Sequence, residues 1–190
     1  MKKPQPRMNC IVTAFVVVAM SFAGCDLSVR PAKPAVLADL EVAAEDPEGY
    51  DRALFGDYDR DAVLAATRRR WRACDGIYSA ADNRCHASED AVQVDHIVAL
   101  SEAWDSGASE WSTVQLDDFA GDVDNLWVMT SALNLAKTDG DAAEWLPPHQ
   151  PAVCDYVTAY IAVKAEWDLT VDRAERRALA DAVDRCTVRT

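Results

Sequence analysis

The chain has 190 residues, of which half are hydrophobic and six are tryptophan, so it can form one ordinary folded domain with extensions. This apolar content excludes a chain that is disordered throughout. The sequence carries 32 acidic and 19 basic residues, a formal net charge of −13, which argues against a protein that coats nucleic acid by broad electrostatic attraction.

Residues 1–25 have the composition of an export signal. A positive start is formed by Lys2, Lys3 and Arg7. Residues 10–22 then form an apolar stretch without a charge, too short to cross a membrane comfortably as a helix. The stretch ends in Ala23-Gly24-Cys25, and small residues before a cysteine resemble a bacterial lipoprotein cleavage site. We predict export with lipidation at Cys25, and a secreted protein cleaved near the same place is the alternative.

Residues 26–49 are predicted to be a flexible tether, because they are rich in proline and alanine and have no apolar period. The folded domain is expected over residues 50–190. In chain order, helices are predicted over residues 59–73, 100–107, 109–120, 131–137, 153–167 and 171–186, with a helical turn over 141–145. Strands are predicted over residues 91–98 and 125–129, and a polar loop over 74–90. Within the third helix, the residues expected to point inward are Trp111, Val114 and Phe119. The predicted class is α+β, mostly helical.

Four cysteines remain once Cys10 and Cys25 are assigned to the export signal, and they permit three disulfide pairings. The pairs Cys74–Cys85 and Cys154–Cys186 close the shortest loops, and we predict both. Disulfides are favoured over a zinc site because export leads to an oxidising compartment and the spacings lack paired C-x-x-C motifs.

Three polar motifs follow one another through the middle of the chain. Asp95-His96 lies at the end of the first predicted strand, Asn125 begins the second, and Asn134 and Lys137 form an N-x-x-K motif in the helix that follows. This pattern resembles the HNH endonuclease superfamily, also called ββα-metal or His-Me finger nucleases. Within it, the chain is similar to small exported bacterial proteins related to the C-terminal nuclease domain of GmrSD-type restriction enzymes.

The resemblance covers roughly residues 50–186 and implies a small two-stranded ββα-metal core that is flanked by helices. Cleavage of a phosphodiester needs an activated water and neutralisation of the charge on phosphate. His96 is the candidate general base because its pKa is ordinarily near neutrality. Asp95 is a candidate metal ligand, and by resemblance Asn134 supplies a second. This all-oxygen set favours one Mg²⁺ or Mn²⁺ over zinc. Asn125 is expected to hold the loop and orient His96.

Two groups of cations leave alternatives open. Lys137 is the single basic residue between residues 86 and 163, against 14 acidic ones. It is expected to contact the scissile phosphate, and the alternative is an ordinary surface lysine. The second group surrounds Trp71 and consists of Arg68, Arg69, Arg70 and Arg72. It is either a patch for the DNA backbone or a solvated, partly salt-bridged face, and the spread of consecutive residues around a helix favours the second interpretation.

The leading hypothesis is an exported, metal-dependent HNH endonuclease that acts on DNA, with RNA left open as a second substrate. We expect a monomer without an organic cofactor, in contact with a membrane only through a lipid anchor. The alternative is a cell-surface lipoprotein that uses the HNH scaffold as a non-catalytic binding module. The acidic charge fits this alternative well. The presence of all five motif residues fits the nuclease better, because a binding module has no physical need for them.

Overall fold

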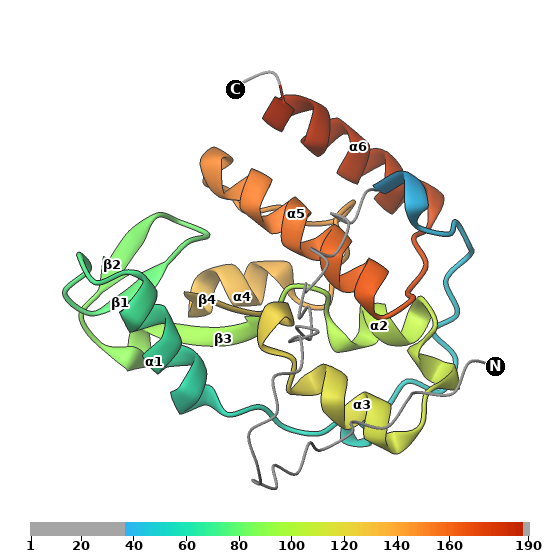
Figure 1. The fold of residues 1–190 in the computed structure, drawn as a ribbon, viewed down its shortest axis with the longest axis horizontal. Coiled ribbons are helices and arrows are strands. Elements are labelled where there is room, and N and C mark those ends of the chain that lie inside the picture. The colour runs from blue at the N-terminus through green and yellow to red at the C-terminus, as the bar shows by residue number, and fades with distance from the viewer. Residues whose placement is uncertain (1–36, 188–190) are drawn as a thin grey trace, which may run out of the picture. The chain divides into compact units, whose positions relative to one another are not determined.

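The computed structural model describes residues 37–187, which contain six α-helices and two antiparallel sheets of two strands each (Figure 1). In chain order the elements are α1 (Arg60–Arg70), β1 (Ile77–Ser79), β2 (Arg84–His86), β3 (Val92–His96), α2 (Leu100–Asp105), α3 (Thr113–Ala120), β4 (Leu126–Thr130), α4 (Ser131–Lys137), α5 (Gln150–Glu166) and α6 (Arg173–Thr187). The predicted α+β class is confirmed. The predicted export signal, its lipidated Cys25 and residues 26–36 of the predicted tether lie outside the described residues. Within residues 37–187, none of the helices has the length and apolar character needed to span a membrane.

The stretch 37–49 differs from the flexible tether predicted for it. Leu40 is buried in the larger hydrophobic core. Val42 forms a β-bridge with Val171, just before α6. The folded domain therefore begins before Tyr50. The sequence showed no apolar period here because single side chains and the backbone make the contacts, rather than one face of a helix or strand.

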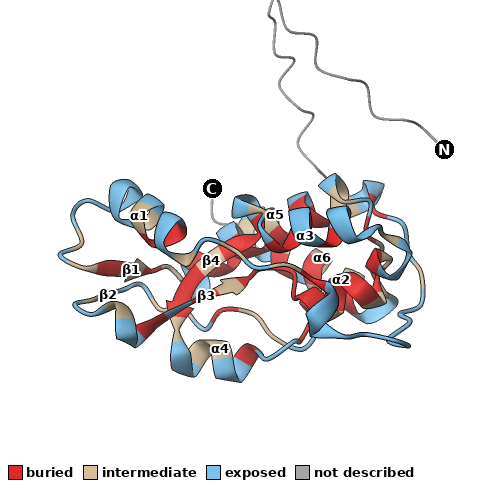
Figure 2. Ribbon diagram, turned by 90° about the horizontal axis from the view of Figure 1, so that it is seen from below, coloured by how far each residue is buried: buried red, intermediate tan, exposed pale blue. Residues whose placement is uncertain are grey.

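The strands β3 and β4 form the sheet that carries the predicted motifs. They pair so that Asp95 lies opposite Trp127 and His96 lies opposite Leu126. Figure 2 shows α1 on one side of this sheet and α4 on the other, and both helices contact β3 and β4. The α1 side is closed by a small apolar core made of Val63, Leu64, Ile77, Val92, Val94, Leu126 and Val128. Alternation along a strand sends Gln93 and Asp95 to the opposite side, where α4 lies.

The segment predicted as a polar loop, residues 74–90, contains the hairpin β1–β2. Tyr78 lies opposite Cys85 in its register. The predicted disulfide Cys74–Cys85 is present and ties the hairpin to the end of α1. Strands of three residues are too short to show a period in the sequence, which is why this hairpin was missed.

The helices α2, α3, α5 and α6 enclose the larger core, which is rich in aromatic rings. The predicted disulfide Cys154–Cys186 is also present and joins α5 to α6. In α3, Phe119 is buried as predicted, but Val114 is exposed and that prediction is wrong. The helix begins at Thr113, and its buried face consists of Leu116, Phe119 and Ala120. A residue two positions before Leu116 points away from this face, because each residue turns the helix by about 100°.

A buried lysine links three of these helices. Lys164 of α5 has its Nζ 3.0 Å from a carboxylate oxygen of Glu175 in α6, and it also pairs with Glu102 of α2. The same ammonium donates a hydrogen bond of 2.7 Å to the carbonyl of Thr170. All three charged side chains are buried. We call Lys164, Glu102 and Glu175 the buried triad.

The buried triad predicts a fall in stability as the pH rises. Burial raises the pKa of Glu102 from 4.5 to about 8, although Lys164 acts against this rise. The folded protein therefore keeps a proton that the unfolded chain releases near pH 4.5. Stability from this proton is fully present below pH 4.5 and is lost as the pH rises toward 8, at up to about 1.4 kcal/mol per pH unit. Glu102→Gln, which mimics the protonated acid, should flatten this dependence in thermal unfolding measured between pH 5 and pH 8.

The exposed variant Glu110→Gln is the matched control for this measurement, because it removes the same charge from the surface. It should keep the pH dependence of the wild type. An equal slope in the wild type and Glu102→Gln would show that the buried triad does not bind the proton.

Candidate active site

The three predicted motifs lie on the β3–β4 sheet, on the 3₁₀ turn that enters β4, and on α4. His96 is the last residue of β3, and Asn125 closes the short 3₁₀ helix Val123–Asn125 that leads into β4. Asn134 and Lys137 lie on α4, which packs on the same sheet. The long insertion between the two strands, residues 97–125, folds as α2 and α3 and brings Ala120 back beside His96.

His96 is buried, with 6% of its surface exposed. Its Nε2 lies 2.9 Å from the carbonyl oxygen of Ala120, and since a carbonyl only accepts, Nε2 carries the hydrogen. The neutral ring then has its lone pair at Nδ1. The ring meets Tyr58 edge-on, with 5.6 Å between centroids, and stacks with Phe119 at 6.5 Å. These contacts determine the tautomer and the orientation of the imidazole.

The pKa of His96 is lowered, chiefly because burial disfavours the charged ring. The hydrogen bond to Ala120 and the charge of Asp95 raise the pKa, and the charge of Lys137 lowers it. His96 is therefore neutral at pH 7. Asp95 and Lys137 thus act on His96 through their charges, although alternation along β3 points Asp95 toward α4 and His96 to the side of Tyr58.

Asn125 is completely buried and is bonded to the loop that follows His96. Its Oδ1 accepts the N–H of Val98 at 2.8 Å, and its Nδ2 donates to the carbonyl of the same residue at 3.2 Å. The backbone carbonyl of Asn125 accepts the N–H of Ile97 at 2.7 Å. Asn125 thus holds the two residues directly after His96, which is the arrangement expected for a residue that orients the histidine.

Replacing Asn125 with alanine should destabilise the protein by about 3 kcal/mol, because the buried N–H and C=O of Val98 lose their partners. Chemical denaturation would measure this loss. The neighbouring exposed residue provides the control, since Asp124→Ala should change stability by less than about 0.5 kcal/mol. Equal effects of the two substitutions would contradict the anchoring role of Asn125.

Lys137 does not lie where it was expected. The prediction placed it against the scissile phosphate, but its side chain is fully buried and its Nζ lies 3.0 Å from Oδ2 of Asp95. Lys137 is three residues after Asn134 and so shares its helical face, as predicted. That face packs onto β3 rather than facing open solvent, and the lysine meets Asp95 there. Within residues 37–187, Asp95 is its only ion-pair partner.

Asn134 contacts a residue that the sequence analysis missed. Its Nδ2 donates a hydrogen bond of 2.7 Å to Oε1 of Gln93. Gln93 lies two residues before Asp95, so both point from β3 toward α4. The alternation of the strand could have identified Gln93. No local pattern could have identified Tyr58, which reaches the site from the segment before α1 and donates its hydroxyl to the carbonyl of Val94.

The donors on the α4 side of the sheet suit a hard divalent cation. Asn134 uses its nitrogen to bind Gln93, so its Oδ1 is left as a free acceptor. Asp95 turns Oδ2 toward Lys137 and has a second carboxylate oxygen. Asp95 is only partly buried, with 17% of its side chain exposed. Carboxylate and amide oxygens are the ligands that Mg²⁺ and Mn²⁺ prefer.

A second group of oxygens lies outside these motifs. Carboxylate oxygens of Glu45, Asp141 and Asp172 lie within 4.8 Å of one another. Asp141 already accepts the backbone N–H groups of Ala143 and Glu144 at 2.8 and 2.9 Å. Asp141 thus caps the turn that follows it, which explains its position without a metal.

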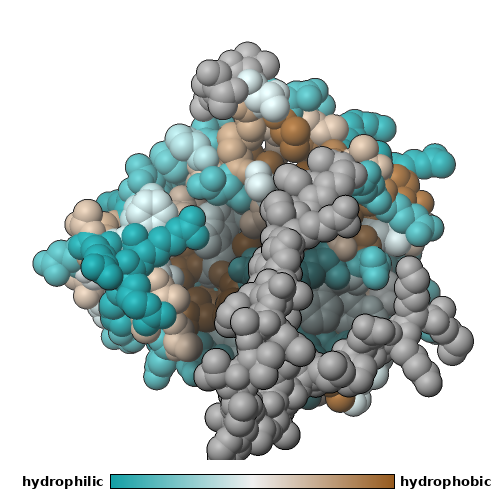
Figure 3. All heavy atoms as spheres, viewed as in Figure 1, coloured by the Kyte–Doolittle hydropathy of each residue, from teal (hydrophilic) through white to brown (hydrophobic). Residues whose placement is uncertain are grey.

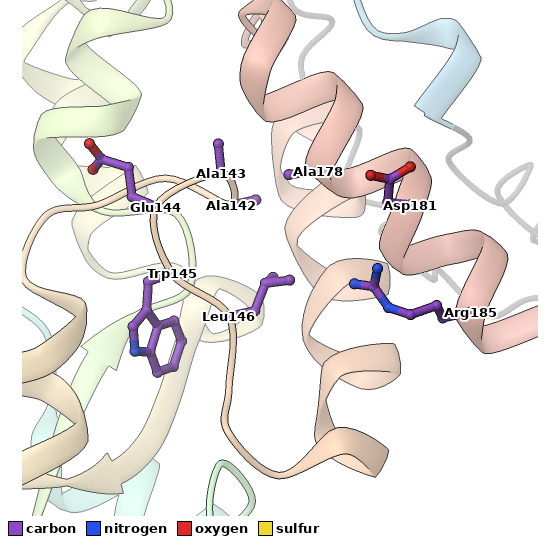
Figure 4. A pocket seen from close by; sticks show the side chains of 8 residues that line it. All are labelled: Ala142, Ala143, Glu144, Trp145, Leu146, Ala178, Asp181 and Arg185. Atoms are coloured by element: carbon purple, nitrogen blue, oxygen red, sulfur yellow. The ribbon is translucent and has the colours of Figure 1, made fainter.

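A pocket of about 290 Å³ lies between residues 142–146 and α6. Figure 4 shows Asp181 and Arg185 on α6 and Leu146 on the facing segment. None of the predicted site residues lines it. The pocket is therefore separate from the candidate active site.

Two antiparallel strands followed by a helix, with Asp-His on the first strand and Asn-x-x-Lys on the helix, define a domain of the HNH class. The comparison with protein families agrees. The chain belongs to the family of GmrSD restriction endonuclease C-terminal domains, whose model matches residues 57–182. It is also similar to an uncharacterized secreted protein of Arthroderma benhamiae, with 33% identity over 169 residues, 80% of this chain and 83% of the relative. No solved structure matches the chain significantly.

Proposed function

We propose that this protein is an exported endonuclease that hydrolyses phosphodiester bonds of DNA with the help of one divalent cation. The observation that carries the proposal is the state of His96. The ring is buried and neutral, and its Nε2–H donates a hydrogen bond to the carbonyl of Ala120. It stands beside Asp95 and Lys137, whose charges act on it. A histidine held in this way is suited to take a proton.

In the proposed reaction, Nδ1 of His96 accepts a proton from the attacking water, because it is the ring nitrogen that carries the lone pair. The Nε2–H bond to Ala120 keeps the ring oriented and supports the imidazolium that forms. Asn125 keeps the following loop in place. The water oxygen forms a bond to phosphorus as the bond to the leaving oxygen breaks. The leaving oxygen takes a proton from solvent, and His96 releases to solvent the proton that it accepted.

The cation would be held by Asp95 and Asn134. When bound, it supplies positive charge for the phosphate and for the leaving oxygen. Lys137 is a positioning residue in this proposal, because its ammonium holds the Asp95 carboxylate from the buried side. Gln93 has the corresponding role for Asn134, because its hydrogen bond to Nδ2 fixes the orientation of the amide. Mg²⁺ or Mn²⁺ is the cation we expect.

Export is supported by the secreted relative and by the composition of residues 1–25. Lipid anchoring at Cys25 and a monomeric state are part of the proposal. The alternative, a non-catalytic binding module at the cell surface, is favoured by one specific observation, the net charge of −13, which repels the DNA backbone.

The test is cleavage of supercoiled plasmid and of single-stranded DNA by the exported, disulfide-bonded protein in Mg²⁺, Mn²⁺ or EDTA. We expect cleavage that requires metal and stops in EDTA. Asn134→Ala should need a higher metal concentration for the same rate, which a contaminating nuclease would not. A folded wild-type protein that is inert in every metal would overturn the nuclease and leave the binding module.

A further inference from the structure

Positive charge at the surface of the described domain comes from arginine alone. Its two lysines, Lys137 and Lys164, are both buried and paired with carboxylates. The arginines are concentrated at one end: six of them lie between residues 60 and 84, where there are only three acidic residues. In an acidic protein, this end is the region best suited to a polyanion.

The end of α1 and the β1–β2 hairpin form one basic and aromatic surface, which we call the α1 patch. Its residues are Arg68, Arg69, Arg70, Trp71, Arg72 and Tyr78. Figure 3 shows hydrophilic side chains gathered over this end of the molecule. Trp71 is 39% exposed although it is one of the largest apolar side chains. Its ring packs against Tyr78 at a tilt of 34° with 4.3 Å between centroids, and the guanidinium of Arg70 lies 5.7 Å from its centroid.

The α1 patch is held in a defined shape. Tyr78 donates its hydroxyl to Asn83 at 2.7 Å, and the disulfide Cys74–Cys85 connects the hairpin to the residues after Trp71. Gly76 has a φ of +138°, and a Cβ there would lie 2.2 Å from the carbonyl oxygen of His86. The Trp71–Tyr78 pair is thus preorganised before any partner binds, which lowers the entropy cost of binding.

The solvated, salt-bridged face favoured by the sequence explains only part of this surface. Arg68 pairs with Glu89. Within residues 37–187, Arg69, Arg70 and Arg72 pair with no carboxylate. The dipole of α1 favours cations in its last turn. It does not account for an exposed tryptophan among them, since burying that ring would otherwise be favourable.

The α1 patch is connected to the candidate active site through α1 itself. Tyr58, directly before the helix, touches His96 with 5.6 Å between ring centroids, and Trp71 lies at the opposite end of the helix. Eleven residues at 1.5 Å per residue place the two ends about 16 Å apart. At the duplex spacing of one phosphate per about 3.4 Å a strand covers that distance in about five nucleotides, and an extended single strand covers it in fewer.

On the basis of the proposed nuclease function, we propose that the α1 patch binds the substrate strand within about five nucleotides of the scissile phosphate. The arginines contact the sugar-phosphate backbone, and Trp71 stacks on an unpaired base. The substrate is thus single-stranded or locally opened nucleic acid, because a paired base offers no free face to the ring. This surface also explains how an acidic protein holds a polyanion.

The test compares binding and chemistry in the same proteins. Binding of a labelled 20-nucleotide single strand is measured by fluorescence anisotropy in EDTA, and hydrolysis is measured with bis(4-nitrophenyl) phosphate, which is too small to reach the patch. Trp71→Ala should weaken binding by about tenfold, and Trp71→Phe should recover part of it. Arg69→Ala/Arg72→Ala should lower the slope of log affinity against log salt by about 1.4. Hydrolysis of the small ester should be unchanged in all of them.

The control is Arg173→Ala/Arg177→Ala, which removes two exposed arginines from α6 and should bind as the wild type does. Equal affinity of the patch variants, the control and the wild type would overturn the α1 patch and leave the nuclease proposal intact. A wild type that binds DNA through the patch but hydrolyses neither the small ester nor DNA would overturn the nuclease proposal instead.

Discussion

Replacing His96 with alanine should lower the rate of DNA cleavage by about 10²- to 10⁴-fold, the range typical for removal of a general base. The reason is that His96 is the imidazole whose neutral state and free Nδ1 follow from its burial and from its bond to Ala120. Metal binding should be retained, because the proposed ligands are Asp95 and Asn134. Single-turnover cleavage with saturating DNA and Mg²⁺ would measure the chemical step without product release.

Two further variants separate catalysis from folding. The ring of His96 is packed against Tyr58 and Phe119, so alanine also removes buried contacts. His96→Gln fills more of this space and should be equally inactive. His149→Ala removes a partly exposed histidine before α5 and should cleave normally. Cleavage by His96→Ala at the wild-type rate would place the base on another residue.

Replacing Lys164 with methionine should destabilise the protein by about 3–5 kcal/mol, the usual loss when one member of a buried ion pair is removed. Methionine keeps much of the volume of the lysine stem, so the loss comes mainly from charge. Glu175 would be left in the core beside the protonated Glu102 without a cation, and Thr170 would lose the donor to its carbonyl. Urea denaturation at pH 7 would measure the change.

The triple variant Lys164→Met/Glu102→Gln/Glu175→Gln tests the cause of this loss of stability. If uncompensated charge is responsible, removing both carboxylates should restore a large part of the lost stability, because no buried charge is then left unpaired. A triple variant as unstable as Lys164→Met would assign the loss to packing or to the Thr170 carbonyl. Cleavage by any folded variant should be close to normal, since the buried triad contacts none of the site residues.

The two buried lysines both pair with carboxylates, in different parts of the fold. Lys137 holds Asp95 against the helix of the candidate active site, and Lys164 joins three helices of the larger core. Because both lysines are buried, neither contributes positive charge to the surface. The acidic exterior is therefore partly a consequence of using lysine inside, and arginine carries all of the exposed positive charge within residues 37–187.

By itself, the sequence determined the features that depend on short-range patterns. Loop length was sufficient to predict both disulfides, and periodicity was sufficient to predict the two strands of the site and all six helices, with ends shifted by a few residues. The pattern of Asp95, His96, Asn125, Asn134 and Lys137 resembles the HNH superfamily, and the family match over residues 57–182 agrees with that resemblance.

Only the tertiary structure decided which residues cover each face of a helix or strand. Lys137 was correctly placed on the face of Asn134, but whether that face meets solvent or β3 depends on how α4 packs. For the same reason the sequence did not reveal the contact of Gln93 with Asn134, the exposure of Val114 or the packing of residues 37–49. Hydrophobic periodicity reports that a face is buried, whereas the partner of an isolated polar group is chosen by residues distant in the chain. The contact of His96 with the carbonyl of Ala120, on which the proposed chemistry depends, joins residues distant in the chain and is an example.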